Sequence, residues 1–396
     1  MNLLLTAVLF CSAAPAAQPA VVRTAELVEA DNKFGLQLFD HITAARPQEN
    51  VFISPLSIAL ALQMTAHGSA GLTWKAMAGA MNLSGLSRSE VAAGNQKLRA
   101  DLVSADKSVR LDIANSLWLR VGVKLQKQFG GDCSNYYSAE VASLDFSRPD
   151  AVNTINDWVA QNTGGRIKQI VSELTPEEFL VLVNAIYFKG TWTREFDKGL
   201  TAPRDFYGIT GAAQRLMMNR EDRFRYKADD AMQAVVLPYG DGRLNLYVFL
   251  PRDKQGLPKL ISSLLTPPSS LLFAGFNEKK GTVTLPRFRI EFEQDLNDAL
   301  TKLGMGLAFT PGADFSAMVA PPMTAAISDV LHKTFVEVNE EGTEAAAVTG
   351  VKMMMTAMPR PEEKFSFVCD HPFLCAIRDD VTGSVLFLGA IYDPKQ

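Results

Sequence analysis

Residues 340–361 read EEGTEAAAVTGVKMMMTAMPRP, and this segment constrains the fold more than any other part of the chain. Its alanines favour a helix or a loop, but read as a strand the segment has two distinct faces. One face carries only small or apolar side chains: Thr343, Ala345, Ala347, Thr349, Val351, Met353 and Met355. Between Thr343 and Met355 there are two charged side chains, Glu344 and Lys352, and both fall on the other face. That pattern is typical of a strand with one side on a hydrophobic core.

The ends of this segment favour a change of structure. Gly342 supplies backbone freedom where the segment leaves the preceding strand. Pro359 and Pro361 prevent a strand from continuing beyond it. We therefore predict a segment that is a loop in one state and a central strand in another. An ordinary alanine-rich surface loop is the alternative that the parity alone leaves open.

The rest of the chain predicts one large globular domain, residues 21–396. Of its 396 residues 47% are hydrophobic, and no linker, charge block or repeat divides them. The net charge is −4, with acidic and basic residues interspersed. We expect no nucleic-acid or membrane partner, and we expect a monomer.

The N-terminus has a different character. An apolar run over 3–10 is followed by small residues through Ala20, which resembles a signal peptide cleaved between Ala14 and Ala20. The run is too short to span a bilayer. We predict a signal peptide over 1–20 and a secreted protein, extracellular or, in a bacterium, periplasmic. A cytosolic chain with an apolar start is the alternative.

Removal of that peptide leaves three cysteines, Cys133, Cys369 and Cys375. An odd number cannot all pair internally, and a core of this size needs no disulfide, so we expect buried thiols. A Cys369–Cys375 bridge is possible. The Asn82 sequon matters only in a eukaryotic source.

Helical patterns dominate the first half. Phe34, Leu38 and Ile42 share one face of a helix that ends before Pro47. Ser54 is placed to cap a second apolar helix that has Pro55 in its first turn. Asp150 is placed to cap a third helix, which Gly164-Gly165 ends.

Strand patterns dominate the second half, which indicates an α+β fold. Residues 244–250 alternate with a period of two. Between 283 and 292 the apolar set changes phase across Pro286-Arg287, which predicts a bulge. Residues 373–377 and 385–391 are continuous apolar runs, suited to buried strands.

Motifs for catalysis are missing. The chain has no GxSxG elbow, Walker loop, GxGxxG turn or HExxH helix, and Ser104 to Lys107 fits a bare SxxK without its companion motifs. Its four histidines, His41, His67, His332 and His371, are far apart in sequence, and no metal-ligand spacing occurs. We expect no enzymatic activity, no metal and no cofactor.

Six motifs resemble those of the serpins, a family of protease inhibitors, and the resemblance runs from about residue 25 to 394. They are NVFISPLS (50–57), HGSAGLT (67–73), NAIYFKGTW (184–192), EEGTEAAA (340–347), DHPF (370–373) and FLG (387–389). The resemblance implies three β-sheets, about nine helices and an exposed reactive-centre loop, about 340–361. It also implies a metastable native state, trapping of a serine protease as an acyl-enzyme, and insertion of the cut loop into a sheet called sheet A.

The resemblance also assigns residues to regions. The hinge, which inserts first, comprises Gly342, Thr343, Glu344, Ala345, Ala346, Ala347 and Val348. The breach, where the loop enters, contains Trp192 and an ion pair between Arg287 and Glu340. The shutter, deeper in the sheet, contains Ser54, Ser57, Asn184 and His332. A charge or a proline at Thr343 or Ala345 would slow insertion and turn the inhibitor into a substrate.

Counting from the hinge glycine places the reactive bond at Thr356-Ala357, with Met355 and Met358 as alternatives. Counting back from Asp370 gives a later bond, near Pro361. We prefer the hinge count because the inserted length must match the sheet, whereas the far side can absorb extra residues.

The expected target, bound covalently, is an elastase- or subtilisin-like serine protease, because the residues near the bond are small or apolar. A non-inhibitory carrier or folding helper, and an inhibitor of cysteine proteases, are the alternatives.

Overall fold

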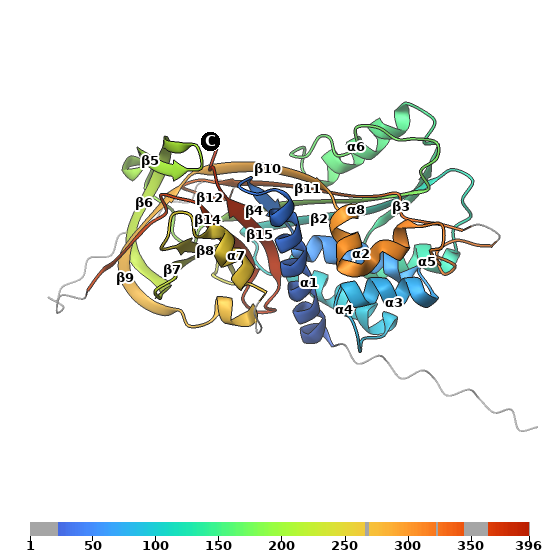
Figure 1. The fold of residues 1–396 in the computed structure, drawn as a ribbon, viewed down its shortest axis with the longest axis horizontal. Helices are drawn as coiled ribbons and strands as arrows, with labels where there is room; N and C mark the ends of the chain where they lie inside the picture. The colour runs from blue at the N-terminus through green and yellow to red at the C-terminus, as the bar shows by residue number, and fades with distance from the viewer. Residues whose placement is uncertain (1–22, 266–268, 322–323, 344–362, 396) are drawn as a thin grey trace, which may run out of the picture.

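The computed structural model describes residues 23–265, 269–321, 324–343 and 363–395 (Figure 1). Residues 1–20 and most of the reactive-centre loop, 344–362, lie outside these ranges.

A six-stranded sheet forms one half of the fold and corresponds to sheet A. Its strand order is β10-β11-β12-β4-β2-β3. The bounds are β10 Phe288–Asp295, β11 Asp329–Val338, β12 Gly342–Thr343, β4 Leu180–Thr191, β2 Val109–Arg120 and β3 Glu140–Leu144. The other five strands form the body of this sheet, whereas β12 has only two residues.

A nine-stranded sheet forms the other half, with the order β1-β15-β14-β8-β7-β6-β9-β13 and with β5 also paired to β6. The bounds are β1 Val51–Ile53, β5 Ala202–Gly208, β6 Gly211–Ala228, β7 Met232–Pro238, β8 Leu244–Pro251, β9 Asn277–Pro286, β13 Phe365–Val368, β14 Phe373–Asp379 and β15 Val385–Ile391. The long strand β6 pairs first with β5 and then with β9, and it pairs with β7 only at its end. It therefore joins two portions that, with sheet A, agree with the three expected sheets.

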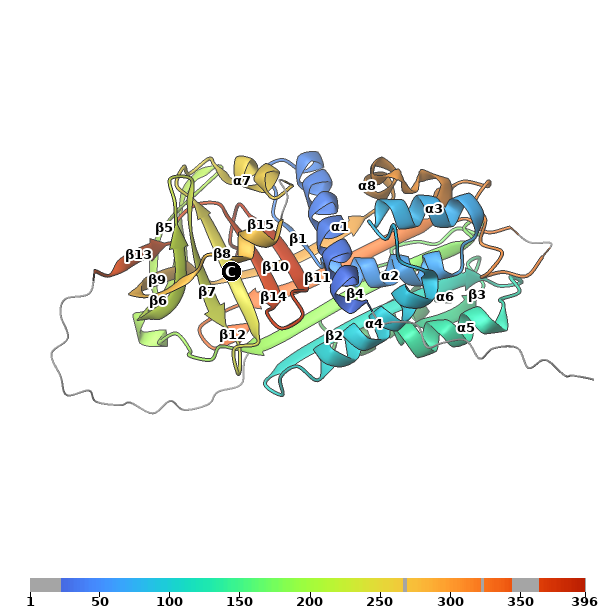
Figure 2. The ribbon, with the colours of Figure 1, turned by 90° about the horizontal axis from the view of Figure 1, so that it is seen from below.

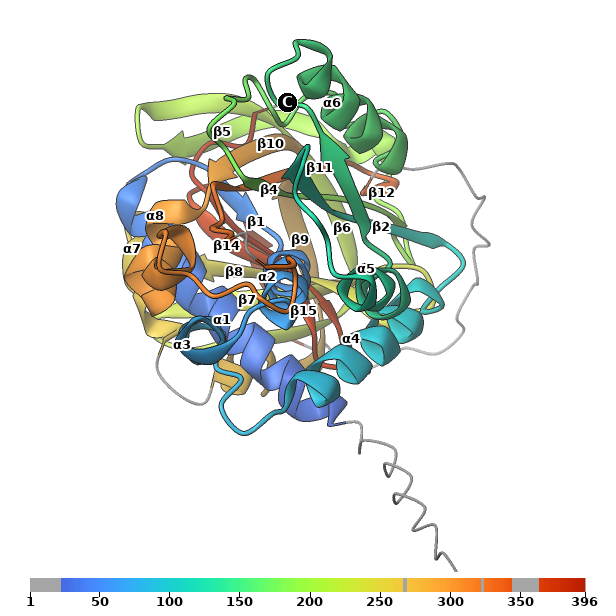
Figure 3. The same ribbon diagram turned by 90° about the vertical axis from the view of Figure 1, so that its right-hand side faces the viewer.

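Eight α-helices lie in the described ranges, close to the expected nine. They are α1 Thr24–Ala45, α2 Pro55–His67, α3 Gly71–Ala80, α4 Arg88–Val103, α5 Lys127–Asp132, α6 Asp150–Asn162, α7 Leu257–Ser263 and α8 Asn297–Leu300. Figure 3 shows α6 on one face of sheet A and α2 on the other. No helix in the described part of the chain is long and apolar enough to cross a membrane.

The predicted helices form, with one correction. Helix α1 ends before Pro47 and buries Phe34, Leu38 and Ile42. The Ser54 side chain caps α2 by accepting a hydrogen bond from the Ser57 N–H. The predicted cap of α6 by Asp150 is wrong. Asp150 is the first residue of that helix and binds the Arg148 side chain instead.

The strand predictions need one correction of topology. Strands β14 and β15 are buried as expected. Strand β8 forms in the stretch whose alternating pattern predicted it, although both of its faces are buried. The phase change at Pro286 is not a bulge. Pro286 ends β9, which pairs with β6, and Phe288 begins β10, which pairs with β11 in the other sheet. The chain changes sheets at this point.

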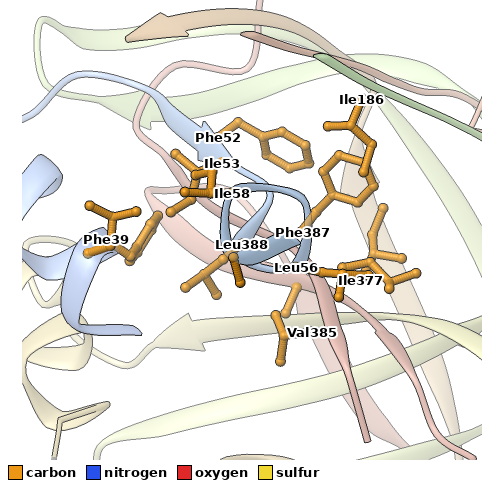
Figure 4. Close-up of a cluster of buried hydrophobic side chains, with 14 of the residues drawn as sticks. Phe39, Phe52, Ile53, Leu56, Ile58, Ile186, Ile377, Val385, Phe387 and Leu388 are labelled. Carbon is orange, nitrogen blue, oxygen red and sulfur yellow. The ribbon is translucent and has the colours of Figure 1, made fainter. Parts of the chain in front are cut away.

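Helix α2 lies in the main core, between the two sheets (Figure 4). All of its residues from Pro55 to Ala66 are buried. Phe387 of β15 packs on Phe52 and on Phe188 of β4, with ring centroids 5.4 and 5.9 Å apart. The segment that leads into α2 is thereby held, through Phe387, against β4 of sheet A. Cys133, Cys369 and Cys375 are buried and unbridged, so the possible disulfide does not form.

Candidate functional site

The central strands of sheet A separate at one end. Strands β4 and β11 pair in parallel from Val181 with Asp329 to Tyr187 with Phe335. Beyond this point β12 lies between them, where Thr343 pairs with Val338 on one side and Gly190 on the other. Strand β12 is antiparallel to both neighbours. The first two hinge residues thus already occupy the start of a new central strand, near the end of the molecule that carries β13 (Figure 2).

Both residues of β12 fit this position closely. Gly342 has φ +150°, and a Cβ there would lie 2.1 Å from the Gly190 carbonyl oxygen. Only glycine is accommodated so close to the β4 backbone. Thr343 is fully buried, and its hydroxyl lies 2.7 Å from the Tyr239 hydroxyl.

Trp192 directly follows β4, beside β12. Its ring stacks on Tyr239 with centroids 4.4 Å apart, and its Nε1–H donates to the Asn339 carbonyl oxygen at 2.9 Å. Its backbone N–H donates to the Glu341 carbonyl oxygen at 3.0 Å. The residues that precede the hinge are therefore held to the end of β4.

An ion pair holds the same residues from the other side. The Glu340 carboxylate accepts from Arg287 Nε at 2.7 Å and from the Thr201 hydroxyl at 2.6 Å. Burial raises the pKa of Glu340, but the hydrogen bonds from Arg287 and Thr201 outweigh it, so the pKa is lowered. Glu341 pairs with Lys198. Glu340 is thus a charged anchor at the breach.

His332 is the centre of a buried network deeper in the sheet. Its Nε2 accepts from the Ser54 backbone N–H at 3.2 Å, so its Nδ1 carries the proton and donates to Asn184 Oδ1 at 2.6 Å. Burial lowers the pKa of His332 to about 3. The imidazole is therefore neutral at physiological pH.

Asn184 extends this network across the sheet and into α2. Its amide nitrogen lies 2.5 Å from Asn115 Oδ1 on β2 and 3.0 Å from the Ser57 carbonyl oxygen on α2. The Ser54 hydroxyl donates to the Leu386 carbonyl oxygen of β15 at 2.6 Å. The shutter therefore links three strands of sheet A to α2 and to the second sheet.

Comparison with known proteins agrees with this geometry. A family model described as "Serpin (serine protease inhibitor)" matches residues 29–394. This chain belongs to the serpin family. It is 36% identical over 387 residues to the leukocyte elastase inhibitor of Bos taurus, covering 93% of this serpin and 100% of that protein. It is 35% identical over 379 residues to Serpin-Z7 of Hordeum vulgare, covering 91% and 95%.

Solved serpin structures have the same fold. The thermophilic serpin tengpin in its native state matches with a TM-score of 0.86 at 29% identity, covering 96% of this chain and 97% of that one. Human thyroxine-binding globulin, complexed with thyroxine, matches with a TM-score of 0.84 at 27% identity, covering 94% of this chain and 100% of that one. The family thus includes both protease inhibitors and a thyroxine-binding protein.

The structure brings the predicted breach residues together, and the predicted shutter residues likewise. The rest of the hinge, Glu344 to Val348, and the reactive-bond candidates Met355, Thr356, Ala357 and Met358 lie outside the described residues. Sequence reasoning missed Asn115, Tyr239 and Thr201. Asn115 was detectable as a polar residue inside the apolar stretch 113–119, whereas nothing local marks Tyr239 or Thr201.

Proposed function

We propose that this serpin irreversibly inhibits a serine endopeptidase by forming an acyl-enzyme and inserting the cut loop into sheet A. The protease serine Oγ attacks the carbonyl carbon of Thr356, the Thr356–Ala357 peptide bond breaks, and the new amine of Ala357 leaves. Thr356 is then esterified to the protease. The observation that carries this proposal is β12, which already lies between β4 and β11 in the orientation that insertion requires.

Extending the observed register supports an uninterrupted insertion. The face of Thr343 would next present Ala345 opposite Phe188 and Ala347 opposite Ile186. Small side chains suit these positions, because both partners belong to the main core. Thr349 would then fall between Asn184 and His332. Insertion must break their hydrogen bond, and the Thr349 hydroxyl can hydrogen-bond to both side chains in its place.

The length of sheet A supports the choice of reactive bond. In the same register Met353 would lie opposite Leu180, the first residue of β4. Thr356 would therefore lie just past the end of the sheet. A strand as long as β4 spans about 40 Å, so the attached protease would be carried to the opposite end of the molecule. A later bond near Pro361 would leave residues without a partner strand.

The residues that flank the reactive bond are small or apolar, so we propose an elastase- or subtilisin-like protease as the target.

Residues 1–20 resemble a signal peptide, so we propose that the inhibitor is secreted. N-terminal sequencing of the protein from its source would show whether it begins between Pro15 and Val21. A mature chain that retains Met1 would contradict secretion by this route.

The deciding experiment is a denaturing gel of the serpin after incubation with elastase, subtilisin, chymotrypsin and trypsin. We expect an SDS-resistant band near the summed mass, and a released C-terminal peptide that begins at Ala357. Ala345→Arg should be cleaved without a complex, because insertion would bury its guanidinium. Glu344→Arg, one residue earlier on the charged face, is the matched control and should still form the complex. Cleavage of the unmodified serpin without complex or gain in heat stability would favour a non-inhibitory carrier.

A further inference from the structure

A hollow of about 470 Å³ lies beside β6 and is rich in arginine. Its charged lining residues are Arg194, Arg220, Arg223, Arg225, Asp222 and Glu278. Four guanidinium groups thus face two carboxylates. Neither the breach nor the shutter uses these side chains.

The hollow lies between the two attachment points of the reactive-centre loop. Arg194 follows closely on Thr191, which pairs with Gly342 at the start of the loop. On the other side, Asp222 pairs with Gly281 of β9, and Gly281 pairs with Phe365 of β13 at the end of the loop. Two strand spacings, about 10 Å, separate Asp222 from the returning chain. A protease bound to the loop would therefore face this surface.

Arg220 carries a charge that its surroundings compensate poorly. Its guanidinium lies between the rings of Phe196 and Phe224, 4.7 and 4.9 Å from their centroids. It donates to the Arg194 carbonyl oxygen, but its buried Nε has no hydrogen-bond partner among the described residues. Burial lowers the pKa of Arg220 to about 10. An incoming anionic group would offset this loss of solvation.

Carboxylates of this chain already balance part of the charge of the hollow. Arg194 pairs with Asp222 at 2.5 Å and Arg225 with Asp380 at 2.9 Å. The mixture of signs disfavours a polyanion, whose uniform charge Asp222 and Glu278 would repel. It suits a protein surface with a few placed carboxylates, which arginine binds in a bidentate manner.

We propose that this arginine hollow docks an acidic surface of the target protease beside the reactive-centre loop. The inference rests on the proposed function and names the chemistry of the partner. Docking of this kind raises the rate of encounter, by about 10- to 1000-fold in steered associations, and leaves the trapping step unchanged.

Subtilisin and its succinylated form, in which surface ammonium groups become carboxylates, provide a matched pair of probes. We would first show that both cleave a small peptide substrate equally, and then measure their association rate constants with the serpin at low and high salt. We expect the succinylated form to react about tenfold faster at low salt. Arg194→Gln/Arg220→Gln/Arg223→Gln should abolish this advantage. Arg194→Gln/Arg223→Gln, which changes only exposed side chains, should reduce it without affecting the fold.

The matched control is Lys75→Gln/Lys127→Gln/Lys302→Gln, which removes the same charge from exposed residues of α3, α5 and the segment after α8. It should keep the advantage. Equal rates for the two subtilisins, or an equal loss in the lysine control, would overturn the proposal. So would heparin binding that requires the arginines while the two rates stay equal.

Binding of succinylated subtilisin with its catalytic serine replaced by alanine, measured by surface plasmon resonance, separates the two proposals. If this binding depends on the arginines but active subtilisin forms no covalent complex with the serpin, the proposed function is overturned and the docking site is supported.

Discussion

Acidification should weaken the native state through His332, although the unmodified protein will largely conceal the effect. In the folded chain the imidazole accepts from the Ser54 N–H and donates to Asn184, so a second proton has no acceptor there. Protonation would also place a charge in a site that is 0% exposed. The shutter can therefore hold only the neutral ring.

The magnitude follows from the pKa values. The folded pKa is about 3 and the ordinary value is 6.5, so the unfolded chain binds more protons between these values. The contribution of His332 to the free energy of unfolding is therefore full above pH 6.5 and is lost as the pH falls towards 3. Between pH 7 and 4.5 this group alone should cost about 2.5 kcal/mol. That is a large share of the roughly 5–15 kcal/mol typical of a domain.

A second buried group acts in the opposite direction. Burial raises the pKa of Asp31 to about 7, although Gln63 donates to its carboxylate. Asp31 contributes stability that is full below pH 3.8 and is lost as the pH rises through 7, about 3 kcal/mol between pH 4.5 and 7. The two effects nearly cancel in the unmodified chain.

Single variants should reveal each effect. Urea unfolding followed by tryptophan fluorescence, at intervals from pH 4.5 to 7.5, measures the free energy of unfolding of the unmodified chain and of His332→Gln. We expect the variant to lose the acid-sensitive part, so that the difference between the two proteins shrinks by about 2.5 kcal/mol on acidification. His41→Gln is the control and should leave the profile unchanged. A difference that does not vary with pH would refute the assignment of a neutral, buried His332.

Three further predictions follow from buried contacts. Asp31→Asn should raise the free energy of unfolding at pH 7.5 and not at pH 4, because the amide stays neutral; the same urea series checks this. Gly342→Ala should raise the number of inhibitor molecules consumed per protease inactivated, because a Cβ would lie 2.1 Å from the Gly190 oxygen and exclude the hinge; titration of protease activity measures that number. Glu340→Gln should speed spontaneous loss of inhibition at 45 °C, because the breach loses a charged anchor for Arg287; residual activity over time, with the half-buried Glu337→Gln of β11 as control, tests this.

Features of the fold that depend on near neighbours in sequence were predictable. The cap of α2 by Ser54 and the end of α1 before Pro47 need only a few adjacent residues. The two faces of the hinge were predictable from the alternation of side chains along a strand. The buried Thr343 lies on the face predicted to contact the core. In these places local chemistry and tertiary structure demand the same residues.

Features that depend on distant partners were not predictable. The phase change at Pro286 looks like a bulge until the partner strands are known, because sheet membership is decided by β6 and β11. The buried series of hydrogen bonds from Asp31 through Gln63 to Asn95 joins three helices. In sequence each of its members is an ordinary polar residue of a helix, so nothing local distinguishes them from solvent-exposed positions.

The proposed insertion implies two states of one chain, and the arrangement of sheet A gives a physical reason for both. Strands β4 and β11 now share a parallel ladder of seven residue pairs, whereas an inserted loop would form antiparallel ladders with both. Antiparallel pairing is slightly more stable per residue and would occur twice, so insertion should lower the free energy. The cost comes earlier, because the His332–Asn184 bond and the contacts of both strands with α2 must yield before Thr349 can replace them. On the proposed mechanism the breach would start the strand and the shutter would delay it, and the native state would persist through a kinetic barrier.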